Sequence, residues 1–274
     1  MTPPIPLAAV IGCPVAHSRS PRLHGHWLAR YGIVGHYVPL QIAPGDLEPA
    51  LRLLPRIGFR GANVTIPHKE AVLALATDVT PGARRIGAAN TLLFTEAGIM
   101  ADNTDAYGFA SNILDHRRDW QPRTTAVIGA GGAARAVLAA LLDRGATEIR
   151  LTNRTPDRAH RLAEVFGPAV QSVRWEARAE MLDGCDTLVN ATALGMTGKP
   201  PLDLALGALP RDAIVNDLVY APLETPLLAA ARARGNPAID GLGMLLHQAV
   251  PGFERWFGLR PQVDRALRDA VLAP

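Results

Sequence analysis

Lys69 and Asp105 are the residues of this sequence whose types are best suited to moving a proton. Lysine is rare in the chain, because only Lys69 and Lys199 are lysines among the 28 basic residues and the others are arginines. An arginine stays protonated, whereas a lysine can be tuned to give up its proton. A lysine and an aspartate beside one substrate hydroxyl form an acid–base pair, and a plain surface ion pair is the alternative.

Two serines near the amino end offer a place for a carboxylate. Ser18 and Ser20 precede Pro21, a residue that suits the first turn of a helix. Two hydroxyls beside the N–H groups of a helix start can hold an anion. The alternative is that Ser20 only caps this helix.

Further polar residues follow strands predicted in the first hundred residues. Thr65 and Lys69 lie at the end of the NVTIPHK segment, Asn90 lies in GAANT, and Asp105 begins a segment of helical period. Open α/β sheets bind ligands at the carboxyl ends of their strands. We therefore expect these four residues to converge on one substrate.

A glycine-rich turn indicates a dinucleotide site. The segment TTAVIGAGGAARAVLAAL places Gly129, Gly131 and Ala134 in a GxGxxA frame between an apolar strand and a helix. Small residues there allow a tight turn, a close approach of the backbone to a pyrophosphate, and packing of the helix on the sheet. A purely structural glycine turn is the alternative. The expected cofactor contacts are Gly129, Ala130, Gly131, Gly132, Ala133 and Ala134.

The residues after the next strand favour NADP over NAD. An NAD enzyme places an Asp or Glu about 20 residues past the loop, whereas an arginine accommodates a 2′-phosphate. This chain has Asn153, Arg154 and Thr155 there, with Arg158 one turn into the following helix. Asp157 could instead pair with either arginine, and both arginines could be ordinary solvated side chains.

Apolar periodicity predicts strands and helices in alternation, which is typical of an α/β fold with a parallel sheet covered by helices. The elements after about residue 120 include a phosphate loop and those before it do not. We therefore expect a domain boundary near residue 105 and a second point near 240 where the chain crosses between the domains. The expected strands are 7–12, 36–41, 61–65, 124–129, 147–153, 185–192 and 213–220, and the expected helices are 20–32, 46–55, 67–76, 131–145, 156–167, 225–234, 243–257 and 261–272.

Composition excludes several other classes of protein. The formal charge is only +3 and the basic residues form no runs, which argues against a nucleic-acid partner. The apolar stretches are too short for a membrane span and the amino end lacks the basic flank of a secretory signal, so we expect a cytoplasmic protein. Cys13 and Cys185 lie far apart without the spacing of a metal site or a disulfide framework, and no metal is expected.

Nine motifs, in order, resemble those of the shikimate dehydrogenase family over essentially the whole chain. They are IGCPVAHSRSP, GANVTIPHK, IGAANT, DNTDAYG, IGAGGAAR, TNRT, NATALGM, DLVYAPLETPLL and DGLGMLLHQA. The resemblance implies NADP-dependent, reversible reduction of 3-dehydroshikimate to shikimate, a step toward chorismate and the aromatic amino acids. It also implies two α/β domains: an N-terminal substrate-binding domain with a mostly parallel sheet, and a C-terminal Rossmann-like NADP domain. The substrate-binding domain would comprise residues 1–104, completed by the C-terminal helices 241–274, and the NADP domain would comprise residues 105–240.

The resemblance also assigns roles to single residues. Ser18 and Ser20 would hold the substrate carboxylate, and Lys69 with Asp105 would be the catalytic pair, with Lys69 usually given the proton transfer. The family often has Asn where this chain has Gly25, which affects a helix contact. Further contacts implied are Thr65, Asn90, Tyr220 and Gln248 to the ring hydroxyls, Asn153, Arg154, Thr155 and Arg158 to NADP, and Val219 and Gly241 near the nicotinamide.

Two other functions remain open from the sequence. An NAD-dependent quinate/shikimate dehydrogenase would normally have an acidic residue near 153–154, which this chain lacks. A non-catalytic metabolite sensor of the same fold would not need both Lys69 and Asp105. The protein is expected to act as a monomer or a homodimer.

Overall fold

The computed structural model describes residues 4–273, which fall into two compact units. The first unit comprises Met1–Thr104 and Leu246–Pro274, and the second comprises Asp105–Leu245. The second crossing lies inside helix α9 (Leu242–Phe257) and not in the turn before it, because this helix begins in one unit and continues into the other. The outermost residues of the expected domain ranges, 1–3 and 274, lie outside the described residues.

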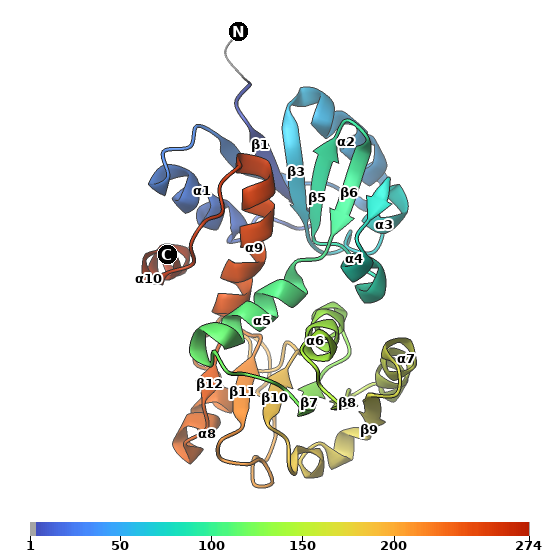
Figure 1. Cartoon of the computed structure of the whole chain (residues 1–274), viewed down its shortest axis with the longest axis vertical. Coiled ribbons are helices and arrows are strands. Elements are labelled where there is room, and N and C mark those ends of the chain that lie inside the picture. The colour runs from blue at the N-terminus through green and yellow to red at the C-terminus, as the bar shows by residue number, and fades with distance from the viewer. Residues whose placement is uncertain (1–3, 274) are drawn as a thin grey trace. The chain divides into compact units, whose positions relative to one another are not determined.

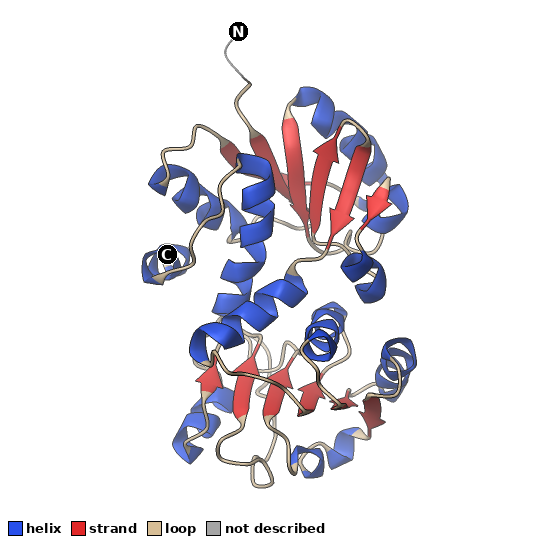
Figure 2. Cartoon of the chain, in the orientation of Figure 1, coloured by secondary structure: helices blue, strands red, loops and turns tan. Residues whose placement is uncertain are grey.

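The first unit contains a six-stranded mixed sheet in the order β2-β1-β3-β5-β6-β4 (Figures 1 and 2). Its strands are β1 (Leu7–Gly12), β2 (His36–Gln41), β3 (Phe59–Val64), β4 (Asp78–Val79), β5 (Thr91–Thr95) and β6 (Gly98–Asp102). β1 pairs in parallel with β2 and β3, and β4 with β6, whereas β5 is antiparallel to both of its neighbours. The two-residue connection between β5 and β6 allows only an antiparallel hairpin. The expectation of a mostly parallel sheet is confirmed.

Successive residues of a strand point to opposite faces of a sheet. Helices pack against these faces in the first unit. The helices of the first unit are α1 (Ser20–Arg30), α2 (Leu47–Leu53), α3 (Val72–Leu75), α4 (Pro81–Ile86), α10 (Arg265–Leu272) and the later part of α9. Ala9 and Ile11 of β1 pack in one cluster with Leu47 and Leu51 of α2. Elsewhere in the unit the indole Nε1 of Trp256 on α9 donates to the Leu92 carbonyl at 3.0 Å.

The second unit contains a six-stranded sheet that is parallel throughout, in the order β12-β11-β10-β7-β8-β9 (Figure 1). Its strands are β7 (Thr124–Ile128), β8 (Glu148–Thr152), β9 (Val170–Val173), β10 (Thr187–Asn190), β11 (Ile214–Asp217) and β12 (Ala238–Ile239). Its first strand therefore lies between its second and its fourth. This is the strand order of a Rossmann sheet, whose switch point lies between the first and fourth strands.

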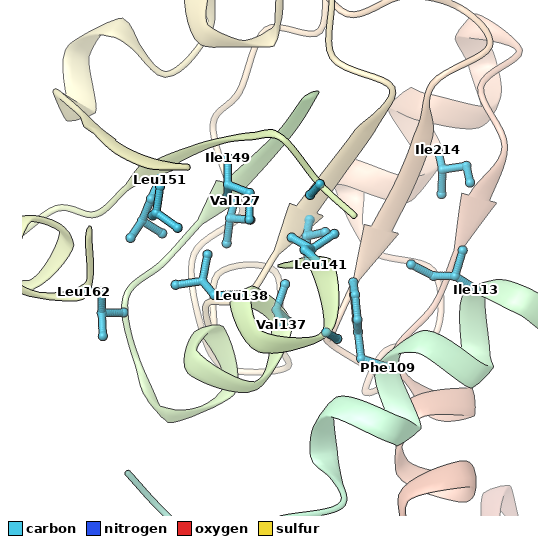
Figure 3. Close-up of a cluster of buried hydrophobic side chains, with 14 of the residues drawn as sticks. Phe109, Ile113, Val127, Val137, Leu138, Leu141, Ile149, Leu151, Leu162 and Ile214 are labelled. Atoms are coloured by element: carbon cyan, nitrogen blue, oxygen red, sulfur yellow. The ribbon is translucent and has the colours of Figure 1, made fainter. Parts of the chain in front are cut away.

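Both faces of the second sheet are buried. Its helices are α5 (Asp105–His116), α6 (Gly132–Asp143), α7 (Pro156–Phe166), α8 (Pro226–Arg234) and the start of α9. Figure 3 shows one face, where Val137, Leu138 and Leu141 of α6 pack toward Val127 of β7. Ile128, the next residue of the strand, belongs to the opposite cluster with Leu228 of α8. Strands buried on both faces explain the unbroken apolar runs of the sequence.

Within residues 4–273, no helix has both the length and the apolar character needed to cross a bilayer. No group of three or more His, Cys, Asp or Glu side chains in the same range is arranged to hold a metal ion.

Candidate active site

Lys69 lies on a turn between β3 and α3. The helix expected over 67–76 is wrong, because only Val72–Leu75 is helical. The Thr65 carbonyl accepts from the His68 N–H at 3.0 Å, and the Lys69 carbonyl accepts from the Ala89 N–H at 2.8 Å. These bonds tie the turn to the segment before Asn90 instead of to a helix. The half-buried Lys69 thus sits just past the carboxyl end of β3.

Asn90 holds together three parts of the first unit. Its Oδ1 accepts from the Thr104 N–H at 2.8 Å and from the Thr91 hydroxyl at 2.9 Å. Its Nδ2 donates to Oε1 of Gln248, on α9, at 3.2 Å. The structure therefore brings together Asn90 and Gln248, two of the expected substrate contacts. Thr104, which immediately precedes Asp105, is fixed in the same network.

Tyr37 and Asn63 extend this network, and the sequence analysis missed both. The Tyr37 hydroxyl donates to Oδ1 of Asn63 at 2.7 Å, and Nδ2 of Asn63 donates to the Asn90 carbonyl at 3.1 Å. Burial raises the pKa of Tyr37 well above its ordinary value, and a hydrogen bond with the Ser20 side chain opposes that shift. Tyr37 and Asn63 therefore connect two expected substrate residues, Ser20 and Asn90. The signal was a polar side chain, Asn63, between the apolar residues Ala62 and Val64 of β3.

The serines lie at the start of α1, but Ser20 is not its cap. The helix begins at Ser20, because the preceding Arg19 already has helical angles (φ −84°, ψ −8°), and no side chain caps it. Instead, Oγ of Ser18 accepts from the Ser20 N–H at 3.3 Å. Ser20 is buried and Ser18 is half-buried. The expectation that Ser20 caps the helix is therefore wrong.

The other expected substrate contacts are divided between the units. Thr65 follows β3 and is half-buried in the first unit, where a Cβ added to Gly12 would lie 2.5 Å from its Cγ2. Asp105 is the first residue of α5 and Tyr220 follows β11, so both belong to the second unit. Both side chains are half-buried.

The glycine-rich loop has the geometry that a pyrophosphate requires. Gly129 has a φ of +109°, and a Cβ there would lie 2.7 Å from Cγ2 of Thr192. α6 begins at Gly132, and Gly131 in its cap position offers no side chain. The first N–H groups of the helix are thus left for an anion. A Cβ on Gly131 or Gly132 would meet nothing within 4 Å, so there is open space beside the loop.

Asn153 joins the end of β8 to this loop. Its Oδ1 accepts from the Ala130 N–H at 3.2 Å, and its Nδ2 donates to the Thr155 carbonyl at 2.9 Å. Arg154 and Arg158 are exposed, and no ion pair joins either of them to Asp157 within the described residues. The alternative in which Asp157 neutralises an arginine is therefore not what the structure contains. Two unpaired guanidinium groups at this position suit a phosphate.

Val219 and Gly241 lie together beyond β11. The Gly241 N–H donates to the Val219 carbonyl at 3.1 Å. A Cβ on Gly241 would lie 2.0 Å from the Leu218 carbonyl oxygen, so only glycine fits. The Val219 N–H donates to Oδ1 of the buried Asp217 at 3.0 Å. Asp217 is a further residue that the sequence analysis missed, although it stands in the DLVY motif.

These features define a class of protein. A parallel sheet in Rossmann order, with a glycine loop after its first strand, belongs to a dinucleotide-dependent oxidoreductase with a separate α/β substrate unit. Three family models match the chain: the shikimate dehydrogenase substrate binding domain over residues 10–92, shikimate/quinate 5-dehydrogenase over 109–196, and the shikimate 5′-dehydrogenase C-terminal domain over 241–270. The chain belongs to the shikimate dehydrogenase family.

Individual relatives agree with this assignment. The shikimate dehydrogenase (NADP(+)) of Paracoccus denitrificans is 62% identical over 98% of this chain and 96% of its own length. The crystal structure of shikimate 5-dehydrogenase from Thermus thermophilus, in complex with NADP(H) and shikimate, has 39% identity, a TM-score of 0.86, and coverage of 97% and 98% of the two chains. Quinate dehydrogenase from Corynebacterium glutamicum, in complex with NAD, has 32% identity, a TM-score of 0.91, and coverage of 98% and 99%.

Proposed function

We propose that this chain catalyses the reversible NADPH-dependent reduction of 3-dehydroshikimate to shikimate. The observation that carries this proposal is the 62% identity to an NADP-dependent shikimate dehydrogenase over nearly the whole chain. The product serves the shikimate pathway, which leads to chorismate and the aromatic amino acids. The cofactor is NADP, because the loop at 129–134 and the exposed Arg154 and Arg158 fit a 2′-phosphorylated dinucleotide.

Two of the residues that we propose for substrate binding, Asn90 and Gln248, are already hydrogen-bonded to each other. Ser18 and Ser20 bind the carboxylate at the start of α1, where helix N–H groups favour an anion. Asn90 and Gln248 face each other across a 3.2 Å hydrogen bond and contact the ring hydroxyls, together with Thr65 and Tyr220. Because the side chains of Asn90 and Gln248 are hydrogen-bonded before the substrate arrives, little ordering of these two remains for binding.

Lys69 and Asp105 carry the proton chemistry. Bound NADPH supplies the hydride for the ring carbonyl. The Lys69 ammonium donates a proton to the carbonyl oxygen as that oxygen gains charge, and in the reverse direction its amine takes the proton back. Asp105 holds the reacting hydroxyl and the ammonium in position. Acid–base help of this kind contributes about 10² to 10⁴ in rate.

The cofactor is held by the second unit. The expected contacts are the backbone of Gly129, Ala130, Gly131, Gly132, Ala133 and Ala134, the side chains of Asn153, Arg154, Thr155 and Arg158, and the nicotinamide-side residues Val219 and Gly241. We assign substrate binding to residues 1–104 together with the C-terminal segment 241–274, and NADP binding to residues 105–240. The second compact unit of the chain ends at Leu245.

The setting of this activity is also a proposal. We place the enzyme in the cytoplasm as a monomer or homodimer that acts on small molecules, without a nucleic-acid, membrane or metal partner. A net charge of +3, spread along the chain, supports the absence of a nucleic-acid partner. Light scattering of the purified protein measures the oligomeric state, and a tetramer would contradict this proposal.

A Lys69→Ala variant tests the assignment of the proton carrier. We expect kcat to fall by about 10² or more, with little change in KM for shikimate, because the lost group acts in the transition state. Reduced-nicotinamide absorbance measures both constants. Lys199→Ala is the matched control, since Lys199 is the other lysine and is exposed. Unchanged turnover in Lys69→Ala would refute the assignment.

The same assay separates the alternative functions. We expect the unmodified protein to oxidise shikimate with NADP and to be slower with NAD or with quinate. Faster turnover of quinate with NAD would instead make the chain a quinate/shikimate dehydrogenase. Binding of shikimate without any absorbance change would identify a metabolite sensor.

A further inference from the structure

Asp217 is a buried aspartate whose hydrogen-bond partners among the described residues are all neutral. It is fully buried at the end of β11. Its Oδ1 accepts from Nδ2 of Asn190 at 2.9 Å and from the Val219 N–H at 3.0 Å, and its Oδ2 accepts from the Thr225 hydroxyl at 2.7 Å. All three donors are neutral. Because donors reach both oxygens, these hydrogen bonds favour the carboxylate form of the group.

Such a group is costly to the fold. Burial raises the pKa of Asp217, and the bonds from Thr225, Val219 and Asn190 lower it. A buried charge usually has an oppositely charged partner. Within the described residues the recorded partners of Asp217 are neutral. An asparagine of the same size would avoid most of the desolvation cost, which raises the question of what the charge does.

The sheet topology gives the position of Asp217 relative to a bound dinucleotide. A dinucleotide spans the switch point of a Rossmann sheet, with one half on each side of it. Here the switch point lies between β7 and β10. Because Arg154 follows β8, the adenosine half with its 2′-phosphate would lie over the β7–β8–β9 side. The nicotinamide half would then lie over β10, β11 and β12, and Asp217 ends β11 at the carboxyl edge that would face it.

The nicotinamide is also where the two oxidation states of the cofactor differ. NADP+ carries one positive charge on this ring, NADPH carries none there, and the rest of the two molecules is the same. A fixed negative charge in a site of low dielectric therefore favours the oxidised ring. Resting on the function proposed above, we propose that the Asp217 carboxylate stabilises the positive charge of the oxidised nicotinamide.

The consequence for the reaction follows from its electron balance. In the reductive direction the C–H bond at the nicotinamide breaks and its electron pair forms a C–H bond at the substrate carbonyl carbon. The carbonyl oxygen takes a proton from Lys69, so the substrate is reduced and the cofactor is oxidised. The ring gains positive charge in this step, which Asp217 favours. The overall equilibrium is unchanged, and the charge alters only the relative affinities for the two forms of the cofactor.

Asp217 also has a structural role that an experiment must separate from this one. It connects the loop after β10, through Asn190, to the start of α8, where Thr225 caps the helix by accepting from the Leu228 N–H at 3.3 Å. Loss of this connection alone would loosen the site for both forms of the cofactor alike. Loss of the charge changes the ratio of the two affinities.

The experiment measures the dissociation constants of NADP+ and NADPH for Asp217→Asn by calorimetric titration. We expect the ratio of the NADP+ dissociation constant to the NADPH dissociation constant to rise about tenfold. A tenfold change corresponds to about 1.4 kcal/mol. Asp212→Asn is the matched control, because Asp212 is an exposed aspartate that precedes the same strand. The control should keep the ratio of the unmodified protein. A ratio within about twofold of the unmodified protein in Asp217→Asn would overturn the proposal.

A second pair of variants applies if Asp217→Asn does not fold. Thr225→Val removes the donor to Oδ2 and keeps the carboxylate, which raises its pKa and lowers its charge, and Thr225→Ser keeps the donor. We expect the ratio of the NADP+ constant to the NADPH constant to rise in Thr225→Val and to keep the value of the unmodified protein in Thr225→Ser. An equal ratio in both variants would overturn the proposal. If the unmodified protein binds neither nucleotide, the proposed function fails as well. If it binds both and turns over shikimate while the ratio is insensitive to Asp217 and Thr225, only this inference fails.

Discussion

Arg154 and Arg158 are the side chains that we propose to set the choice of cofactor. Both side chains are exposed where β8 ends and α7 begins. Among the described residues, neither guanidinium group has a hydrogen-bond or ion-pair partner. A guanidinium matches the planar, bidentate geometry of a phosphate. NAD lacks that phosphate, so these arginines should discriminate between the two cofactors without changing how the shared part of the molecule is held.

Arg154→Ala should weaken NADP binding about tenfold or more and leave NAD binding within about twofold, because a lost charge-assisted hydrogen bond costs about 1.5–3 kcal/mol. Titration of both nucleotides measures the effect. Arg161→Ala, an exposed arginine on the same helix, is the control and should change neither affinity. Equal losses for NAD and NADP in Arg154→Ala would contradict a phosphate contact.

The site residues were predictable to different degrees. Gly129 and Arg154 follow from a local motif, because strand, turn and helix are adjacent in the chain. Asn90 and Gln248 are 158 positions apart, so only the family resemblance could associate them before their contact was seen. Tyr37 reads as one more apolar residue of a strand, and its hydrogen bond to Asn63 depends on the pairing of both strands with β1.

At the scale of elements, the stretch around Lys69 shows why local pattern failed. Residues 67–76 have helical periodicity, yet the backbone bonds of this stretch go partly to Ala89 and only one short turn of helix forms. Tertiary hydrogen bonds therefore overrode the local preference.

The phosphate loop gives a prediction at this scale. Gly129→Ala should lower the free energy of unfolding by about 1–3 kcal/mol, since alanine is strained at a φ of +109° and its Cβ would lie 2.7 Å from Thr192. It should also weaken NADP and NAD alike. Urea unfolding and nucleotide titration measure these effects. Gly145→Ala, with a φ of +90° and open space around the added Cβ, is the control for strain alone and should leave nucleotide binding intact.

At the scale of the whole molecule, the prediction of two α/β units is confirmed, as is the assignment to the family. The alternation of apolar strands with helices was sufficient to predict the α/β units, and the ordered motifs were sufficient to predict the family. The antiparallel β5 was not foreseen, since its hairpin partner β6 contains few of the branched residues that mark a strand.

His24 makes the stability of the protein depend on pH. It is buried and stacked on Tyr37, with ring centroids 3.9 Å apart. Burial lowers its pKa from 6.5 to about 3, against a smaller opposing effect of Asn63. The unfolded chain therefore binds an extra proton between these two values. Stability is complete above the unfolded pKa and is lost as pH falls, by up to about 1.4 kcal/mol for each pH unit.

His24→Phe keeps an aromatic ring in this cluster and removes the titrating group. We expect its free energy of unfolding to fall less between about pH 7 and about pH 4 than that of the unmodified protein. Urea unfolding at a series of pH values gives this comparison. His36→Phe replaces an exposed histidine of the same strand as Tyr37 and should keep the original slope. An unchanged slope in His24→Phe would show that another group is responsible.

The double hydrogen bond of Asn153 bears on any attempt to engineer the enzyme for the cheaper cofactor NAD. The obvious exchange is Asn153→Asp, which places an acid near the ribose. An aspartate would still accept from Ala130, but its second oxygen would face the Thr155 carbonyl, which now receives a donor at 2.9 Å. The exchange would thus set two oxygens against each other directly beside the glycine-rich loop. A useful redesign must supply a new donor for that carbonyl in the same step.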